Sequence, residues 1–239
     1  MNPKPKAEPV RYKYTFSFDS ADPKVFEIAL DASTLELIQD RDLPKPEWAK
    51  LIFFPCEHCP LAEHTEYCPV AVNLSRIVTE FKDSVSHERT HVTVETPERT
   101  YVKDTTLQKG LSSIIGIYMV TSNCPVMDKL RPMVRFHLPF ATPTETMFRT
   151  VSTYLTGQFL VMREGKKPDW ELQHLVELYK SISAVNRGMS RRISNASIKD
   201  ANVNAVIILH AFGDAVPYFI ENGLAEIKHF FDIYTRSDT

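Results

Sequence analysis

Hydrophobic and polar residues alternate along the N-terminal part of the chain, and this pattern predicts β-strands. Aromatic residues occupy every second position from residue 12 to 18, with polar residues between them. A period of two places one face of the chain in a core and the other in water, as in a half-buried strand. Short apolar runs at residues 25–30 and 35–38 follow turn-rich sequences. We therefore expect an antiparallel meander of three strands.

The hydrophobic period changes near residue 70, which marks the first helix. Leu74, Ile77 and Phe81 recur three or four residues apart, the spacing of one helical face. Alternation returns at residues 92–94 and 101–102, on either side of the turn sequence TPER. This second region predicts a β-hairpin.

Beyond residue 104 the chain is expected to be helical to its end. The predicted helices span residues 104–122, 143–163, 169–192 and 200–234, with boundaries good to a few residues. Gly165 is expected to end the second of these helices. Pro217 and Gly223 are expected to kink or divide the last one.

The predicted fold class is α+β, with N-terminal antiparallel strands and one helix followed by a helical C-terminal half. Residues 1–10 are rich in lysine and proline and predict a disordered arm. Residues 11–104 form the α+β part and residues 105–239 the helical part. These two parts can also form one continuous domain, because 239 residues suffice for one large core.

The composition does not indicate one function, but it disfavours several classes of function. The apolar fraction of 43% is ordinary for a globular protein, and a net charge of -2 lacks the basic excess of nucleic-acid-binding proteins. The N-terminus has no apolar stretch of the kind found in secretory signals. The longest apolar runs, residues 114–120 and 203–209, are too short to span a bilayer. We expect a cytoplasmic protein with a protein partner, and no nucleic acid or membrane.

The positions of the four cysteines carry the clearest chemical signal. Cys56 and Cys59 form a CxxC pair, Cys68 follows in the same segment, and Cys124 lies far downstream. In a reducing compartment, sparse and clustered cysteines indicate metal or redox chemistry more than structural disulfides. We predict that all four thiolates hold one metal centre, which would join the two halves of the chain.

Two kinds of centre fit four thiolates. Zinc takes four tetrahedral ligands, and a CxxC turn brings two sulfurs to one ion with little strain. A [4Fe-4S] cluster also takes four cysteines, and Cys–Pro steps such as Cys59-Pro60 recur in ferredoxin motifs. Pro60 has no N–H group to donate to sulfur, which favours the cluster somewhat. Zinc is the first expectation and the cluster is the alternative.

Other interpretations of this region remain open. His58 or His64 can replace one cysteine in a Cys₃His site, although both histidines can equally be exposed loop residues. The cysteines can also be free thiols that pack as small apolar residues. A thiol-exchange role needs a helix N-terminus at the CxxC pair, which Pro60 and the loop-like sequence after it disfavour.

One metalloprotease motif occurs in an unsuitable context. Residues 87–91 read HERTH, which matches the HExxH pattern of zinc proteases. That chemistry needs both imidazoles one helical turn apart, but His91 leads directly into the alternating sequence VTVET. We interpret the segment as a polar junction between a helix and a strand.

Two further groups of polar residues are weaker candidates. Arg131, Arg135 and His137 place charge in an apolar segment and can bind an anion, or else cap helix ends and pair with acidic neighbours. His210 and Asp214 lie four residues apart on an apolar helix, where a core hydrogen bond is the commoner outcome. The chain has no nucleotide-binding glycine loop and no GxSxG motif. We therefore assign no catalytic residue.

Several segments together resemble an uncharacterised family of bacterial proteins that is catalogued only as a domain of unknown function. These segments are YTFSF, FEIALDASTLELI, CEHCPLAEHTEYCPVA, TPERT, LSSIIGIYMVTSNCP, LRPMVRFHLPFA and VNRGM. They extend from about residue 11 to 230, and the cysteine-containing pieces are the most specific. The resemblance implies a shared fold and a shared cysteine site but no reaction.

Three functions are compatible with the sequence. The first is a non-enzymatic binding or regulatory module whose four cysteines hold a structural zinc ion. The second is a redox or sensor protein with an iron–sulfur cluster. The third is an enzyme with an anion-binding pocket near Arg135 and His137. We rank them in this order.

Overall fold

A computed structural model describes residues 7–38 and 45–235 and shows an α+β fold. Residues 1–6 of the predicted arm lie outside the described residues, and the first strand begins at Val10. The four strands form one antiparallel sheet in the order β2-β1-β3-β4. Their bounds are β1 Val10–Ser17, β2 Lys24–Leu30, β3 Arg89–Glu95 and β4 Thr100–Thr106. The predicted hairpin around TPER is confirmed as β3 and β4.

The alternation of the first strand is also confirmed, because its aromatic face is buried. Tyr14 and Phe16 are fully buried, while the neighbouring Lys13 is exposed. The β1–β2 register sets Tyr14 opposite Phe26, and the β1–β3 register sets it opposite Val94. These buried partners make one apolar face of the sheet, and the opposite face is polar.

The third expected strand, residues 35–38, is reduced to a single bridge between Leu37 and Leu30. The carboxylate of Asp31 accepts hydrogen bonds from the backbone N–H groups of Ser33 and Thr34, each at 2.9 Å. This Asx-type turn is followed by Leu35 with a positive φ of 57°. A backbone that turns in this way cannot continue as a regular strand, so the predicted meander is a two-stranded hairpin with one added bridge.

Helices occupy most of the remaining chain and follow the predicted segments. The longer helices are α1 Pro69–Glu80, α2 Leu107–Val120, α4 Pro143–Arg163, α5 Gln173–Ala196 and α6 Ala201–Glu221. The short ones are η1 Glu47–Ala49, η2 Met127–Leu130, α3 Pro132–Arg135, α7 Ala225–Lys228, η3 His229–Phe231 and α8 Asp232–Thr235.

Local sequence signals explain where several helices begin and end. At the start of α4, Thr142 and Glu145 form a reciprocal capping box. Gly165 follows α4 with a φ of 75°, and Gly223 follows α6 with a φ of 61°. Both glycines take a left-handed conformation that ends a helix at little cost. The division of the last predicted helix at Gly223 is therefore confirmed, while Pro217 lies inside α6.

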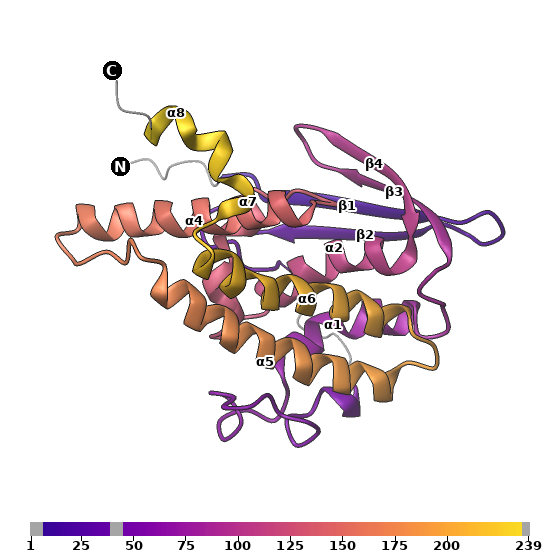
Figure 1. Ribbon diagram of the computed structural model, residues 1–239. Coiled ribbons are helices and arrows are strands. Elements are labelled where there is room, and N and C mark those ends of the chain that lie inside the picture. The colour runs from indigo at the N-terminus through magenta and orange to yellow at the C-terminus, as the bar shows by residue number, and fades with distance from the viewer. Residues whose placement is uncertain (1–6, 39–44, 236–239) are drawn as a thin grey trace, which may run out of the picture.

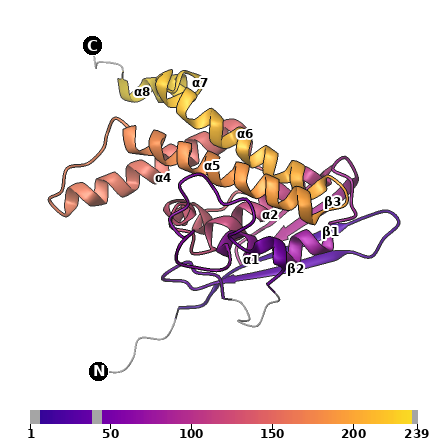
Figure 2. The ribbon, with the colours of Figure 1, turned by 90° about the horizontal axis from the view of Figure 1, so that it is seen from below.

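The elements form layers, with the sheet on one side and helices stacked beneath its buried face (Figure 1). Helix α2 contacts β3 and β4 and packs against α1 and α6. At Gly110 of α2, an added Cβ would lie 2.9 Å from the Phe16 ring, so the glycine permits close approach of helix and sheet. Helices α5 and α6 pack side by side as the outer layer (Figure 2). One core cluster includes buried residues from the strands and from all of these helices.

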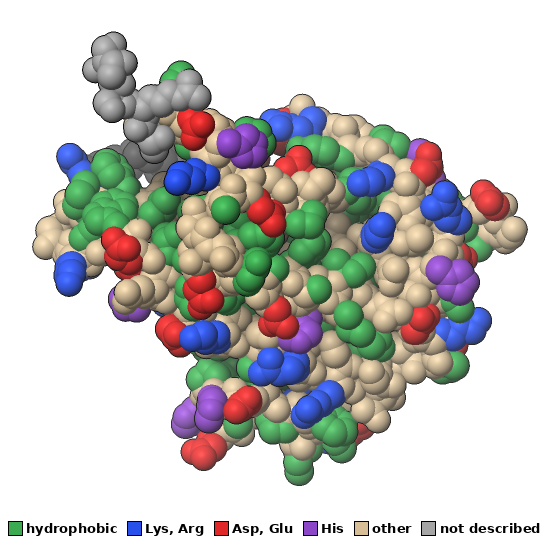
Figure 3. Space-filling view, in the orientation of Figure 1, with side chains coloured by type: hydrophobic (Ala, Val, Ile, Leu, Met, Phe, Trp, Pro, Cys, Tyr) green, Lys and Arg blue, Asp and Glu red, His purple; other side chains and the backbone are tan. Residues whose placement is uncertain are grey.

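The outer surface carries apolar side chains at one end of the molecule. The end of α4 and the loop before α5 project from the body (Figure 1), and Figure 3 shows hydrophobic side chains gathered there. Phe159, Leu160 and Met162 of α4 are exposed, as is Trp170 in the loop. Helix α6 is long and apolar enough to cross a bilayer by length and composition alone, but here it packs against α2 and α5.

Candidate metal centre

All four cysteines line one pocket of about 340 Å³. Cys56 and Cys59 lie in the turn-rich segment after η1, Cys68 directly precedes α1, and Cys124 follows α2. All four are free thiols. Cys68 and Cys124 are buried, whereas Cys56 and Cys59 are half-buried. The fold thus gathers on one pocket the residues that the sequence predicted as metal ligands.

Backbone hydrogen bonds fix the segment that carries the first three cysteines. The N–H of Cys68 donates to the carbonyl of Ala49 at 2.8 Å, and the N–H of Leu51 donates to Glu66 at 2.8 Å. These bonds close residues 51–66 into a loop with adjacent ends. Within the loop, the N–H of Cys59 donates to the carbonyl of Cys56 at 3.1 Å, so the CxxC sequence forms a tight turn.

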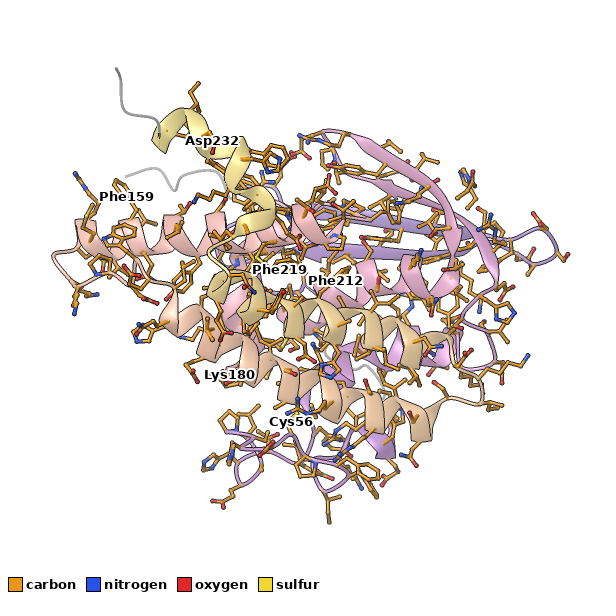
Figure 4. The ribbon with its side chains drawn as sticks, in the orientation of Figure 1. Cys56, Phe159, Lys180, Phe212, Phe219 and Asp232 are labelled. Carbon is orange, nitrogen blue, oxygen red and sulfur yellow. The ribbon has the colours of Figure 1, made fainter. Side chains whose placement is uncertain are left out.

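Helix α5 supplies the opposite wall of the pocket and contacts Cys56 directly. At Gly188 of α5, an added Cβ would lie 2.9 Å from the sulfur of Cys56 and 3.4 Å from its Cα. Only glycine accommodates the CxxC turn at this distance without displacement of one of the two segments. Figure 4 shows Cys56 in the loop directly beneath α5.

Burial favours the protonated form of three of these thiols. Burial, together with the nearby thiols of Cys68, Cys59 and Cys124, raises the pKa of Cys56 to about 12. Burial also raises the pKa values of Cys68 and Cys124. A bound metal cation reverses this preference, because it stabilises thiolates.

Arg192, a buried cation whose charge acts on Cys56 and Cys68, forms no ion pair with a carboxylate among the residues that the structure describes. Arg192 of α5 is 1% exposed and donates through Nη1 to the carbonyls of Trp48 at 3.1 Å and Lys50 at 2.6 Å. Its Nε and Nη2 atoms have no hydrogen-bond partner among the described residues. The charge of Arg192 favours the thiolate forms of Cys56 and Cys68. This guanidinium therefore suits a neighbouring group of net negative charge, as a four-thiolate metal centre is.

The spacing of the ligating side chains limits the kind of metal centre that this pocket could hold. Among the described residues, no three side chains of histidine, cysteine, aspartate or glutamate are close enough to hold one ion as they stand. A single ion would therefore require the four thiols to move closer together, whereas a larger group could bind each thiolate at a different metal atom. The His58 side chain is 92% exposed, and His64 is exposed as well.

The other predicted site residues are divided between different surroundings. Arg131 forms ion pairs with Asp128 at 2.5 Å and with Glu36 at 3.5 Å. Arg135 is exposed at the end of α3. His137 instead lines a second cavity of about 190 Å³ between α2, α4, α5 and α6. The structure therefore does not bring these three side chains together as one anion site.

His137 is held as a neutral imidazole. Its Nε2 lies 2.6 Å from the hydroxyl of Tyr14 and 3.4 Å from that of Ser113. Burial lowers the pKa of His137 to about 3, with a smaller contribution from the charge of Arg149. At neutral pH this ring contributes hydrogen bonding but no positive charge to the cavity.

The two remaining histidine motifs occupy surface and interhelical positions. Strand β3 begins at Arg89, so the HERTH segment is no helix, and exposed His91 bonds Asp104 at 2.7 Å. His210 lies 3.4 Å from Asp214, whose carboxylate also accepts a hydrogen bond from Ser183 at 2.5 Å. This second pair links α6 to α5.

Three residues that the structure places at the thiol pocket and the second cavity could not be identified as site residues from the sequence. They are Gly188 and Arg192 beside the thiols and Arg149 at the second cavity. Gly188 lies inside a long predicted helix, where a glycine is unfavourable without a packing reason. That mismatch was the one available signal. The two arginines resemble ordinary helix-surface cations in sequence.

Comparison with known proteins identifies the family of the chain and no individual relative. No curated protein and no solved structure matches it. A family model matches residues 10–232, which span both the strands and the helices. The chain therefore belongs to the family described as a domain of unknown function, DUF6901.

Proposed function

We propose that this protein binds a metal centre through Cys56, Cys59, Cys68 and Cys124 and functions as a redox or sensor module. The observation that carries the proposal is the convergence of all four cysteines, from two segments far apart in the sequence, on one pocket. A random set of buried thiols has no reason to share a pocket. Because four protein thiolates fill the coordination shell, the centre has no open position for a substrate, which argues against metal catalysis.

The spacing of the ligands favours an iron–sulfur cluster over one zinc ion. Among the described residues, no three ligating side chains are close enough to hold a single ion, whereas the four cysteines of a cluster bind different iron atoms. A [4Fe-4S] cluster would supply one-electron chemistry, with each cysteine on a different iron. The chain itself would supply the thiolates, cover Cys56 with α5 at Gly188, and balance negative charge with the buried Arg192.

Structural zinc is the second candidate, and the CxxC turn favours it. Cys56 and Cys59 are joined by a backbone hydrogen bond of 3.1 Å, an arrangement that presents two sulfurs to one ion. In this case the thiols contract around zinc, and the protein functions as a binding module whose fold the metal stabilises.

The test is the metal content and absorption spectrum of full-length protein purified without air, for the wild type and Cys124→Ser. About four iron atoms with acid-labile sulfide per chain, and a broad visible band, support the cluster. About one zinc ion and no visible band support the second candidate. No metal in the wild type, or the same metal content in both proteins, overturns the four-thiolate centre.

A further inference from the structure

The second cavity lies on the other side of α5 and has a different character. Its volume is about 190 Å³, and it lies between α2, α4, α5, α6 and the segment around α3, with one side open to solvent. Most of its lining is apolar, including Ile117, Leu138, Phe140, Ile182, Leu209 and Phe212. Figure 4 shows Phe212 between α6 and the layer of α2. A largely apolar cavity with a few polar groups is typical of a small-molecule site.

The charged groups of this cavity are all of one sign. Arg149 of α4 and the exposed Lys109 of α2 line it, and none of the described lining residues is acidic. Arg149 donates from Nε to the carbonyl of Phe136 at 3.2 Å and from Nη2 to that of Met133 at 3.0 Å. These bonds hold the guanidinium at the cavity wall.

Arg149 has no carboxylate within ion-pair distance among the residues that the structure describes. Glu145, one turn earlier on α4, accepts both the N–H and the hydroxyl hydrogen of Thr142 in the capping box. Burial lowers the pKa of Arg149, as expected for a desolvated cation. A partly buried arginine that lacks a carboxylate is suited to an anionic ligand.

We propose that this cavity binds a small organic acid, with its carboxylate on Arg149 and its apolar body between α2, α5 and α6. The volume of 190 Å³ is slightly larger than the roughly 150 Å³ of an engineered cavity that binds benzene. The apolar body therefore has about the size of one aromatic ring or a short alkyl chain. The aromatic rings of Phe140, Tyr179 and Phe212 in the lining favour an aromatic ring.

The polar groups near Arg149 agree with a carboxylate ligand. Ser113 lines the cavity, and its hydroxyl lies 2.9 Å from that of Tyr14. Where Tyr14 donates in this pair, the hydroxyl hydrogen of Ser113 is free to donate to an anion. His137 is neutral and introduces no competing charge. The apolar lining excludes a strongly hydrated anion such as inorganic phosphate, because its desolvation would be uncompensated.

The cavity offers a steric test that leaves Arg149 intact. Gly116 of α2 lines the cavity, and a Cβ there would meet only Leu209, at 3.8 Å. The first atom of a side chain at Gly116 therefore meets no backbone, and we expect the rest of a leucine to occupy part of the cavity. Gly157→Leu is the matched control, because Gly157 lies in α4 with no atom within 4 Å of an added Cβ. Both changes replace a helical glycine with a better helix former.

The experiment is calorimetric titration of full-length protein with phenylacetate, and with phenylacetamide as its neutral analogue. We expect saturable phenylacetate binding in the millimolar to micromolar range, at least about tenfold tighter than phenylacetamide. Gly116→Leu should abolish binding and Gly157→Leu should retain it. Arg149→Gln should reduce the preference for the acid, and Arg149→Lys should keep part of it.

Any of four outcomes would overturn the proposal. The first three are the absence of saturable binding of phenylacetate and hexanoate at millimolar concentration, equal affinity for phenylacetate and phenylacetamide, and unchanged binding in Gly116→Leu. Inorganic phosphate that competes with phenylacetate would also contradict it, because the site would then recognise charge alone.

Discussion

The thiol pocket and the acid-binding cavity share a wall, α5, but are built in different ways. Residues 177, 180, 181 and 184 of α5 line the thiol pocket, whereas Tyr179, Ile182 and Asn186 line the cavity. The two sets recur at helical spacing on nearly opposite faces of the helix. The other walls of the cavity are mainly long helices, while those of the thiol pocket are mainly loops that carry cysteines.

This difference indicates which site depends on its occupant. Packed helices hold the cavity open whether or not a ligand is present. The loop with Cys56 and Cys59 has exposed apolar residues, including Ile52 and Phe54, and is held mainly by backbone hydrogen bonds at its ends. Such a segment gains order from metal ligation. We therefore expect metal loss to disturb the thiol pocket strongly and the cavity little.

Cys124→Ser should produce the largest effect. Removal of one ligand should abolish stoichiometric metal binding and lower the free energy of unfolding by several kcal/mol, because structural metal binding adds directly to folding free energy. Denaturant unfolding monitored by circular dichroism measures the loss. Metal-free wild-type protein is the control, and it should match the variant. A variant as stable as the metal-loaded wild type would contradict a structural centre.

Arg192→Gln tests the charge beside the thiols. Loss of a buried cation next to an anionic centre should cost about 3 kcal/mol in the metal-loaded protein. The neighbouring Arg191 is exposed, so Arg191→Gln is the matched control. The loss should be smaller in metal-free protein. Equal losses with and without metal would mean that Arg192 acts only through the carbonyls of Trp48 and Lys50.

His137→Gln tests the environment of His137 in the second cavity through the pH dependence of the free energy of unfolding. The pKa of His137 is lowered from 6.5 to about 3 in the folded protein, so only the unfolded chain binds a proton between these values. Its contribution to stability is therefore present above pH 6.5 and lost as the pH falls towards 3. Between pH 7 and pH 5 this amounts to at most about 2 kcal/mol.

Denaturant unfolding at both pH values measures this slope. The variant should have a shallower dependence on pH than the wild type, because it lacks the titrating ring. Equal slopes in the two proteins would show that His137 is protonated to the same extent in the folded and unfolded states.

Gly188→Ala should have the smallest effect, and its sign is informative. An alanine in a helix normally gains about 1 kcal/mol over glycine, which we expect for the control Gly157→Ala. At position 188 the new Cβ meets the Cys56 sulfur at 2.9 Å, so the gain should become a net loss of about 1 kcal/mol. Metal affinity should fall in Gly188→Ala alone. A gain in both variants would mean that the CxxC turn adapts freely.

The spacing of hydrophobic residues predicted much of the fold, because the residues at these spacings are the ones that the structure buries. The aromatic alternation located β1, and the helical spacing located α1. The predicted boundaries were less accurate where tertiary contacts, and not local sequence, decide them. The helix predicted from residue 104 begins instead at Leu107, because β4 extends to Thr106. The first N–H groups of α2 donate to the carbonyls of Glu88 and Ser86 and not to a capping side chain.

Only those site residues that belong to a rare residue type could be predicted from the sequence. Cysteine is scarce in this chain, so its spacing stands out in the sequence. Arginine is common, and nothing in the sequence separates the buried Arg192 from the exposed Arg191. The difference arises when η1 packs against α5 and offers its carbonyls. Such contacts depend on tertiary structure and leave no local pattern.

The strand order has a consequence for the folding pathway. Strands β1 and β3 are neighbours in the sheet but far apart in the sequence. The segment with Cys56, Cys59 and Cys68 lies between them along the chain. Contacts so distant along the chain slow folding, since loop closure precedes any gain from strand pairing. A metal that gathers these three thiolates first shortens the free segment that β3 must close. With the proposed metal centre, the rate at which the sheet is completed would depend on the availability of metal during folding.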